Sequence, residues 1–515
     1  MATSDHNDET ETFSDGTPLP EEPAATGGKG PTPAQILVQM AEDDYRLIRA
    51  DDGRTYAVPR NGPNIAIPLS SRSGSGVRAR LAASLRRRTG QVASGSALSD
   101  CVNVLEGEAS EQDPQPVYLR MARHTDQDGQ PSVVVDLGTE TGQAITITPD
   151  GWRIDAQAPV IFRRSELTHP LVDPVPDGSL DGLRALINLS EEDYRLAIGW
   201  VVAAYLTDMP HPILFIQGEQ GSAKSNLIRS LLSVLDPQPA ADRTPPGSQR
   251  EWAIFARASW GFSFDNVTEI PEWLSNSLCK GVTGDAVLQR ALHSDEDIVV
   301  FSFQRVIAMT TIGIKHALAG DLVDRLLLIE PDVIDQRMSE EDLRAARAAV
   351  LPHALGAVLD LVAGVLQVLP GIRVTDLPRM ADFARVLAAL DQVTGWDTLA
   401  TYRAKIADMS MTLIEGNAFA QALYRLLTTP TYDGSAPPER WEGTAAELLS
   451  ALQEICRRAN IAIAELPENV QALGVRLSQV SPSLRKVGID IRRGARSGRR
   501  RPLIIRRVRD DEPAA

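Results

Sequence analysis

Cysteine is scarce in this sequence, and long apolar runs are absent. The 515 residues include three cysteines, Cys101, Cys279 and Cys456, which lie far apart and form no CxxC pair. This spacing excludes a disulfide scaffold and a cysteine-rich zinc site, and it is typical of a reducing cytoplasm. No run approaches the roughly 18 uninterrupted apolar residues of a membrane span, and the acidic start MATSDHNDETETFSDG lacks the pattern of a secretory signal. We therefore expect a cytoplasmic protein without a membrane partner.

Net positive charge is also absent, although basic residues gather at one end. The net charge of −16 argues against a protein that coats DNA with a uniformly basic surface. Between Arg476 and Arg509, however, twelve lysines and arginines stand against one acidic residue, Asp490. Such a density neutralises phosphates and predicts salt-dependent nucleic-acid binding. The alternative is a solvated tail that docks on the acidic N-terminus of the chain.

The length of the chain predicts about three folded units. Residues 1–30 are rich in Asp, Glu, Thr, Pro and Gly, and we expect a disordered acidic arm there. Residues 31–170 combine helical segments with short alternating runs, which indicates an α+β N-terminal domain; its basic helix, 78–88, has the pattern of a solvated surface helix. Strands and helices alternate over 180–430, which predicts an α/β unit with a helical extension. Residues 440–509 have the order helix, helix, β-hairpin, which suits a winged helix.

The strongest motif is the glycine-rich run GEQGSAKS, which follows the strand PILFIQ and precedes the helix KSNLIRSLLSVLD. Gly218 and Gly221 permit a tight turn whose N–H groups point at phosphate oxygens. In such a P-loop Lys224 reaches the β- and γ-phosphates of ATP, and Ser225 coordinates Mg²⁺. Ala223 replaces the usual second glycine, which is tolerable if its φ stays negative. The alternative is a glycine-rich βα turn without a ligand. The predicted ATP-binding residues are Gly218, Glu219, Gln220, Gly221, Ser222, Ala223, Lys224 and Ser225.

A second acidic position follows the apolar run WGFSF. Asp265 ends this predicted strand and offers a carboxylate to the Mg²⁺ shell beside Ser225. The alternative is an ordinary Asp at the end of a strand. Most ATPases of this type have a glutamate next, which orients or deprotonates the attacking water, whereas this chain has Asn266. An amide orients water but is a poor base, so we expect slow hydrolysis.

Three later positions complete the set of candidates. Thr310 and Thr311 end the strand VIAMTT, where a hydroxyl either touches the γ-phosphate or its water, or caps the strand. Arg290, in VTGDAVLQRALH, is a predicted DNA contact, with a surface arginine as the alternative. Arg325, in DLVDRLLLIEP, is either ion-paired or reaches the nucleotide of a neighbouring subunit and stabilises the transition state there. The second role requires an oligomer.

Taken together, the motifs GEQGSAKS, FSFDN, VTGDAVLQRALH, VIAMTT and DLVDRLLLIEP resemble the superfamily 3 helicase branch of the AAA+ ATPases, in particular phage and poxvirus-type primase-helicases. The runs IPEWLSNSLCKGVTGD, GDLVDRLLLIE and LPRMADFARVLAALD also resemble an "ATP-binding protein" family of actinobacterial genomes, phages and mobile elements. This likeness extends over roughly residues 35–510. It implies a P-loop NTPase core that uses ATP and Mg²⁺ and assembles into a homo-oligomer, with a hexamer as the arrangement that the resemblance suggests. Ala223, Asn266 and the Thr310–Thr311 pair, where the helicases usually have Asn, depart from the pattern.

Three functions fit these observations. The first is a DNA-dependent ATPase, a helicase-like motor in the replication or mobilisation of a phage or mobile element; Lys224, Ser225, Asp265 and Arg325 favour it. The second is an ATP-gated DNA-binding switch with little hydrolysis, which Asn266 favours. The third is a DNA-binding adaptor whose P-loop is structural. In all three, the winged helix contacts single- or double-stranded DNA, and the predicted contacts are Arg485, Lys486, Arg496, Arg499, Arg500 and Arg501.

Overall fold

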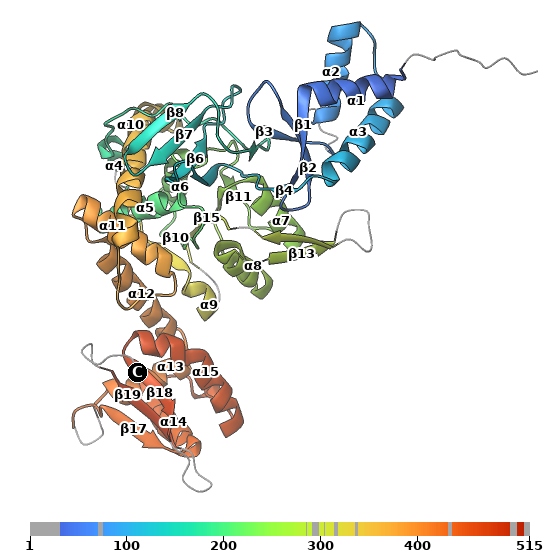
Figure 1. Cartoon of the computed structure of the whole chain (residues 1–515). Helices are drawn as coiled ribbons and strands as arrows, with labels where there is room; N and C mark the ends of the chain where they lie inside the picture. The colour runs from blue at the N-terminus through green and yellow to red at the C-terminus, as the bar shows by residue number, and fades with distance from the viewer. Residues whose placement is uncertain are drawn as a thin grey trace, which may run out of the picture.

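The computed structural model describes residues 31–70, 76–284, 286–290, 298–302, 304–313, 318–334, 338–430, 435–494 and 502–508. Within these ranges the strands form five sheets, and the fold is mixed α/β. The first helices of the chain lie at one end of the molecule, a parallel sheet lies in the middle, and the last strands lie at the other end (Figure 1).

The N-terminal sheet carries three helices on one face. Its strand order is β4-β1-β2-β3-β9, and an Asp-Gly turn joins β1 to β2, with Gly53 at φ 78°. Ala57 and Ile67 point into a core with the three helices, while Val58 and Ala66 join a core on the opposite face, as the period of two requires. The elements are α1 (Pro33–Asp44), β1 (Tyr45–Ala50), β2 (Thr55–Pro59), β3 (Ile65–Pro68), α2 (Val77–Thr89), α3 (Gly95–Ser110), β4 (Pro114–Gln115) and β9 (Phe162–Arg163).

A four-stranded antiparallel sheet follows, and its core is shared with the centre of the molecule. Its strands are β5 (Met121–Thr125), β6 (Pro131–Asp136), β7 (Ala144–Thr148) and β8 (Gly151–Asp155). Val133, Val135 and Ile145 lie in one hydrophobic cluster with α10 (Glu340–Val368), and Figure 1 shows this helix behind β7 and β8. The predicted boundary near residue 170 stays a prediction, because the apolar core runs across it.

The central sheet is parallel throughout, with the order β11-β12-β15-β10-β16. Ile213 and Phe215 of β10 point into one core, and Leu214 and Ile216 point into another, so the strand is buried on both faces. This explains why its sequence is a continuous apolar run rather than an alternating one. The strands are β10 (Ile213–Gln217), β11 (Asp242–Arg243), β12 (Gly261–Phe264), β15 (Val306–Thr311) and β16 (Leu326–Ile329).

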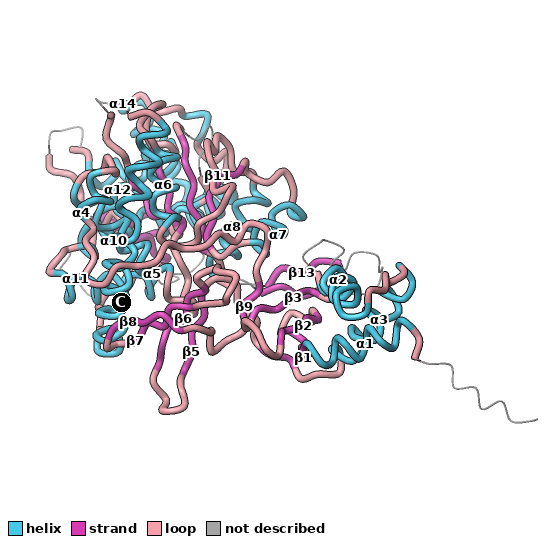
Figure 2. The backbone as a smooth tube through the Cα atoms, turned by 90° about the horizontal axis from the view of Figure 1, so that it is seen from above, coloured by secondary structure: helices cyan, strands magenta, loops and turns pink. Residues whose placement is uncertain are grey.

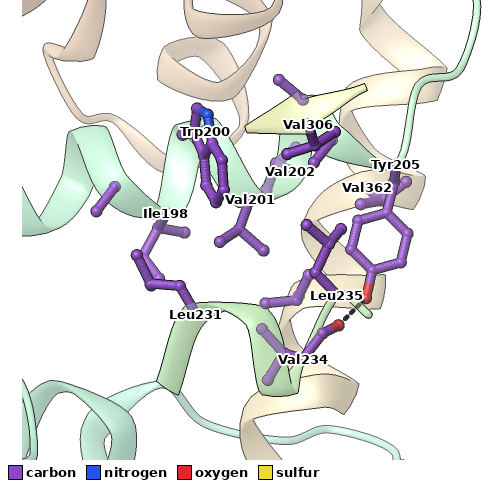
Figure 3. Packing of buried hydrophobic residues seen from close by; sticks show 14 of the residues in the cluster. Ile198, Trp200, Val201, Val202, Tyr205, Leu231, Val234, Leu235, Val306 and Val362 are labelled. Atoms are coloured by element: carbon purple, nitrogen blue, oxygen red, sulfur yellow. Dashed lines mark hydrogen bonds between the residues drawn. The ribbon is translucent and has the colours of Figure 1, made fainter. Parts of the chain in front are cut away.

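Helices cover both faces of this sheet. On one face α5 packs against α6, where Val201, Leu231 and Leu235 share a core and the Tyr205 hydroxyl donates a hydrogen bond to the Val234 carbonyl (Figure 3). On the other face α7 and α8 cover the sheet, with Trp252 and Leu278 buried. The helices are α4 (Asp181–Ala185), α5 (Glu191–Ala204), α6 (Lys224–Ser233), α7 (Gln249–Ala258), α8 (Glu272–Thr283) and α9 (Gly320–Val323).

One of the described helices, Glu340–Gly371, is long and apolar enough to cross a membrane by length and composition. The buried core helices of soluble proteins in general pass the same test. In this helix Leu355, Leu359 and Val362 are fully buried in the central core. The mostly helical segment that follows it consists of η1 (Leu369–Gly371), α11 (Ala381–Thr394), α12 (Thr398–Glu415) and α13 (Ala418–Thr428).

The C-terminal unit contains two helices and a three-stranded sheet of order β17-β19-β18. The strand β17 is not among the elements predicted for residues 440–509, and it pairs with β19, the second strand of the predicted hairpin. The acidic residue of the basic tail, Asp490, is buried and lies within 4.0 Å of Arg485, Arg492 and Arg506. Its elements are β17 (Arg440–Gly443), α14 (Ala445–Ala459), η2 (Ile463–Glu465), α15 (Val470–Lys486), β18 (Ile489–Arg493) and β19 (Leu503–Arg507).

Candidate functional site

The loop between β10 and α6 lies at the carboxyl edge of the parallel sheet, and its path depends on glycine. A Cβ on Gly218 would lie 2.9 Å from Ser222 Oγ and 3.2 Å from Pro331 Cγ, so the position has no room for a side chain. Gly221 has φ 88°, a region that side chains disfavour. Glu219, Gln220 and Gly221 are exposed at the tip of the loop.

Ala223 adopts a left-handed conformation, with φ 54° and ψ 31°. The condition under which the sequence makes alanine tolerable here, a negative φ, is therefore not met. The physical reason is that the loop must turn sharply into α6, and this residue is the N-cap of the helix. No side chain caps α6, so the N–H groups of its first turn, together with the positive end of the helix dipole, are suited to an anion.

Lys224 closes the loop on itself. Its Nζ donates to the carbonyls of Gly218 at 2.8 Å and Glu219 at 2.6 Å. Burial lowers the pKa of Lys224, while the nearby carboxylate of Asp265 acts in the opposite direction. The amine is therefore held at the centre of the loop by two neutral acceptors, which an anionic oxygen can replace.

The ends of β12 and β15 bring three of the candidate side chains together next to the loop. Ser225 Oγ donates to both carboxylate oxygens of Asp265 at 3.1 Å. Thr310 Oγ1 donates to Asp265 Oδ1 at 2.5 Å and accepts from the Asn266 N–H at 2.7 Å. Thr311 does not take part, because its hydroxyl donates to the Val267 carbonyl at 2.7 Å and caps the strand. Of the two threonines, only Thr310 thus faces the carboxylate.

Asn266 is exposed at the edge of this cluster, with φ 53°. Asparagine tolerates the left-handed region better than most residues, since its short polar side chain interacts locally. Asn266 follows Asp265 just after the carboxyl end of β12. Because β12 runs parallel to β15 in the central sheet, Asn266 lies at the same edge of the sheet as Lys224.

Arg325 lies at the opposite end of the sheet. The Ile213 N–H donates to its carbonyl at 2.8 Å, at the amino end of β10, whereas the loop follows the carboxyl end of that strand. Its side chain is 7% exposed and donates to the carbonyl and to Oδ1 of Asp321, at 2.7 Å and 2.5 Å. The structure thus does not bring Arg325 to the loop of its own chain, and it holds the guanidinium in an ion pair.

The predicted DNA contacts are spread over distant elements. Arg485 is 62% exposed and lies 3.6 Å from Asp490. The Lys486 amine forms a salt bridge with Asp324, which links α15 to the turn before β16. Arg290 ends β13 (Ala286–Arg290), which pairs with β14 (Ile298–Ser302) in a hairpin whose first strand the sequence does not predict. The remaining contacts, Arg496, Arg499, Arg500 and Arg501, lie outside the described residues.

One residue that supports the loop escapes sequence reasoning. Asn188 Nδ2 donates to the Ser222 carbonyl at 3.0 Å and to the Asp332 carbonyl at 2.6 Å. The Asp332 N–H donates back to the Asn188 carbonyl at 2.9 Å. This asparagine therefore ties the loop to the segment after β16. An Asn two residues before a helix N-cap reads as an ordinary turn residue, so no sequence signal reveals the contact.

A search of the curated proteins gives no match to this chain. Among solved structures it is similar to "SCCmec type IV Cch - active helicase", with 11% identity, 90% of this chain and 93% of that chain covered, and a TM-score of 0.42. It is also similar to "The A form apo structure of NrS-1 C terminal region-CTR", with 12% identity, 93% and 100% covered, and a TM-score of 0.39.

Two family models match consecutive parts of the sequence. Residues 180–411, which contain the loop, the central sheet and α10–α12, match the Actinomycete integrative conjugative element replication protein. Residues 419–513 match the AICE RepA C-terminal domain. The chain therefore contains both the replication-protein domain and the C-terminal domain of the actinomycete integrative conjugative element replication proteins.

Proposed function

We propose that the chain binds ATP with Mg²⁺ at the loop between β10 and α6, and that it is a DNA-dependent, helicase-like ATPase in the replication of a mobile element. The observation that carries the proposal is the cluster of Ser225, Asp265 and Thr310 beside Lys224. A P-loop NTPase of the AAA+ type needs a hydroxyl, a carboxylate, an ammonium and a polar group on the neighbouring strand at one sheet edge. The family matches support a role in replication.

The residues present fit the nucleotide and its metal. The uncapped first turn of α6 offers N–H donors to phosphate, and Lys224 exchanges its two carbonyl acceptors for phosphate oxygens. Among the described residues no group of three or more His, Cys, Asp or Glu side chains could hold a metal by itself. Mg²⁺ suits such a site, since it usually takes one or two protein ligands and completes its shell with water and phosphates; here Ser225 and Asp265 would supply them. Held by these residues, Mg²⁺ would neutralise charge on the phosphates.

The chain's own residues divide the remaining work. Thr310 orients the Asp265 carboxylate through its short hydrogen bond and connects it to the backbone of Asn266. Asn266 is placed to orient a water molecule, although its amide cannot accept the proton. Arg325 would act on the nucleotide of a neighbouring subunit, which makes a homo-oligomer part of the proposal, with a ring of six as the arrangement that the resemblance implies. This role requires Arg325 to exchange its Asp321 partner for phosphate.

For DNA binding we propose the C-terminal unit as a winged helix. The helices α14 and α15 precede the hairpin of β18 and β19, and β17 completes the small sheet. The exposed guanidinium of Arg485 lies at the end of α15, and Arg496 and the Arg499–Arg501 run belong to the connection between the two hairpin strands. Repeated phosphate contacts of this kind make binding strongly salt-dependent. We place the protein in the cytoplasm.

A second function, an ATP-gated DNA switch with little hydrolysis, is favoured by Asn266. The decisive measurement is ATP binding by calorimetry and ATP turnover with and without single-stranded DNA. Turnover that rises with DNA supports the motor, tight binding without turnover supports the switch, and no binding leaves a DNA-binding adaptor. Lys224→Ala should abolish ATP binding, while Lys280→Ala, on the exposed side of α8, should keep it. Unchanged affinity in Lys224→Ala refutes the assignment of the site.

A further inference from the structure

The N-terminal unit contains a basic groove that the proposed ATPase does not use. The groove has a volume of about 550 Å³ and lies between α2 and the turn after β2. Figure 1 shows α2 at the outer end of the N-terminal unit, far from the C-terminal strands, and in both Figure 1 and Figure 2 α2 lies far from α6. Its lining includes Tyr45, Asn61, Arg80, Ser84, Arg87 and Arg88.

The sequence of α2 explains why one side of the groove is positive. Its thirteen residues include five arginines and no acidic residue. Val77, Leu81 and Leu85 are buried against α1 and α3, so the arginines are directed to the other faces. Arg80 and Arg87 are seven residues apart, which is close to two helical turns, and both therefore lie on the groove side.

Two of the three groove arginines are available for a ligand. Arg88 forms a salt bridge with Asp44, at 2.6 Å and 2.8 Å from its two carboxylate oxygens. Arg80 and Arg87 are exposed, and neither makes a hydrogen bond or an ion pair within the described part of the chain. A surface helix whose arginines only aid solubility would not need to place three of them around one groove.

The aromatic side chain of Tyr45 lies within the field of all three arginines. It is half-buried; burial raises its pKa and the nearby Asp44 carboxylate adds to that rise, while Arg80, Arg87 and Arg88 act in the opposite direction. The groove therefore combines a phenol ring, an amide from Asn61 and two free guanidinium groups. Ring faces stack on bases and guanidinium groups bind phosphates, which is the combination found in proteins that bind single strands.

We propose that the groove between α2 and the β2–β3 turn binds the backbone of single-stranded DNA through Arg80 and Arg87. The two Cα atoms are about 10.5 Å apart along the helix, which is about three times the rise of about 3.4 Å per nucleotide that a strand has in duplex DNA. The inference goes beyond the proposed function, because it gives DNA a second contact on the N-terminal sheet. A strand held there and at the C-terminal unit would be bound at both ends of the molecule. Asp44 limits the affinity, since it occupies Arg88.

The test uses neighbouring arginines of the same helix in the full chain. Arg87 lines the groove and Arg86 does not, yet both are exposed in the last turn of α2. Binding of a fluorescein-labelled oligo-dT is measured by anisotropy over a series of salt concentrations. Arg87→Ala should reduce the slope of log K against log salt by about 0.7, and Arg80→Ala/Arg87→Ala by about 1.4, while Arg86→Ala should leave it nearly unchanged. Asp44→Asn should steepen the slope by up to about 0.7, because it frees Arg88.

Equal slopes for Arg86→Ala and Arg87→Ala overturn the proposal. Matching far-ultraviolet circular dichroism establishes that each variant is folded. The effect of Arg87→Ala on the salt dependence of DNA binding can be judged independently of whether the chain hydrolyses ATP. If the ATPase is absent, the Arg87→Ala effect on the slope remains; if the groove is wrong, DNA still stimulates hydrolysis in Arg87→Ala with wild-type half-saturation.

Discussion

Replacing Ala223 by glycine should stabilise the protein, although glycine in or next to a helix normally does the opposite. Ala223 has φ 54°, and an L-residue in this region costs about 1–2 kcal/mol. Glycine removes that strain, but it adds about 0.4–1 kcal/mol of conformational entropy to the unfolded chain. The difference leaves a gain of about 0.5–1 kcal/mol in the free energy of unfolding. For a unit of this size the gain corresponds to an increase of about 1–4 °C in the unfolding temperature.

The assay is calorimetric unfolding without nucleotide, with a second alanine as the control. Ala345 is exposed near the start of α10, a regular helix, so Ala345→Gly should lower the free energy of unfolding by about 1 kcal/mol. The same substitution is thus expected to have opposite signs at the two positions. ATP affinity should be kept or improved in Ala223→Gly, because the N–H groups of the loop keep their directions.

A loss of stability in Ala223→Gly similar to that in Ala345→Gly would refute the left-handed assignment. It would then follow that Ala223 has helical backbone angles and that the loop enters α6 by another path. A stabilised variant with abolished ATP binding would instead retain the backbone assignment and contradict the proposed phosphate site.

Three further predictions concern catalysis and acid stability. Asn266→Glu should raise ATP turnover by about 10²-fold, near the bottom of the usual range for a general base. The control Asn266→Gln adds the same length without charge and should not raise turnover. Equal turnover in the two variants would show that water is activated elsewhere. Arg325→Ala should bind ATP without hydrolysing it. Mixing Arg325→Ala subunits with Lys224→Ala subunits should partly restore ATP hydrolysis, because one interface then holds an intact site. Mixed subunits that stay inactive, together with a lower unfolding temperature of Arg325→Ala, would indicate that Arg325 has a purely structural role. Burial lowers the pKa of His211 to about 4, so the unfolded chain takes up the proton at a higher pH than the folded chain does. The contribution of neutral His211 to the free energy of unfolding is therefore fully present above pH 6.5 and should fall by about 3 kcal/mol as the pH drops towards 4. Urea titrations that show the same pH dependence in His211→Gln would contradict this prediction.

The sequence alone determined the features that depend on a few neighbouring residues. The run GEQGSAKS between an apolar strand and a helix defines a tight turn between the two elements, because glycine spacing and helix start are local properties. The turn between β1 and β2 and the hairpin of β18 and β19 are encoded in the same way, by turn residues between alternating runs. The mixed α/β character followed from the two periods of the apolar residues.

Only the tertiary structure decided the contacts between distant segments. The register of β12 against β15 selects Thr310 rather than Thr311 as the partner of Asp265, since alternate residues of a strand face opposite sides. The order of the sheet places Arg325 at the edge opposite the loop, and the approach of the segment after β16 brings Asp332 to Asn188. The strand β17 escaped prediction because its pairing partner, β19, is distant in the sequence and is supplied by a tertiary contact rather than by a local pattern. Ala223 is the clearest case: its sequence favours a right-handed helix start, and the sharp turn of the loop into α6 imposes the left-handed one.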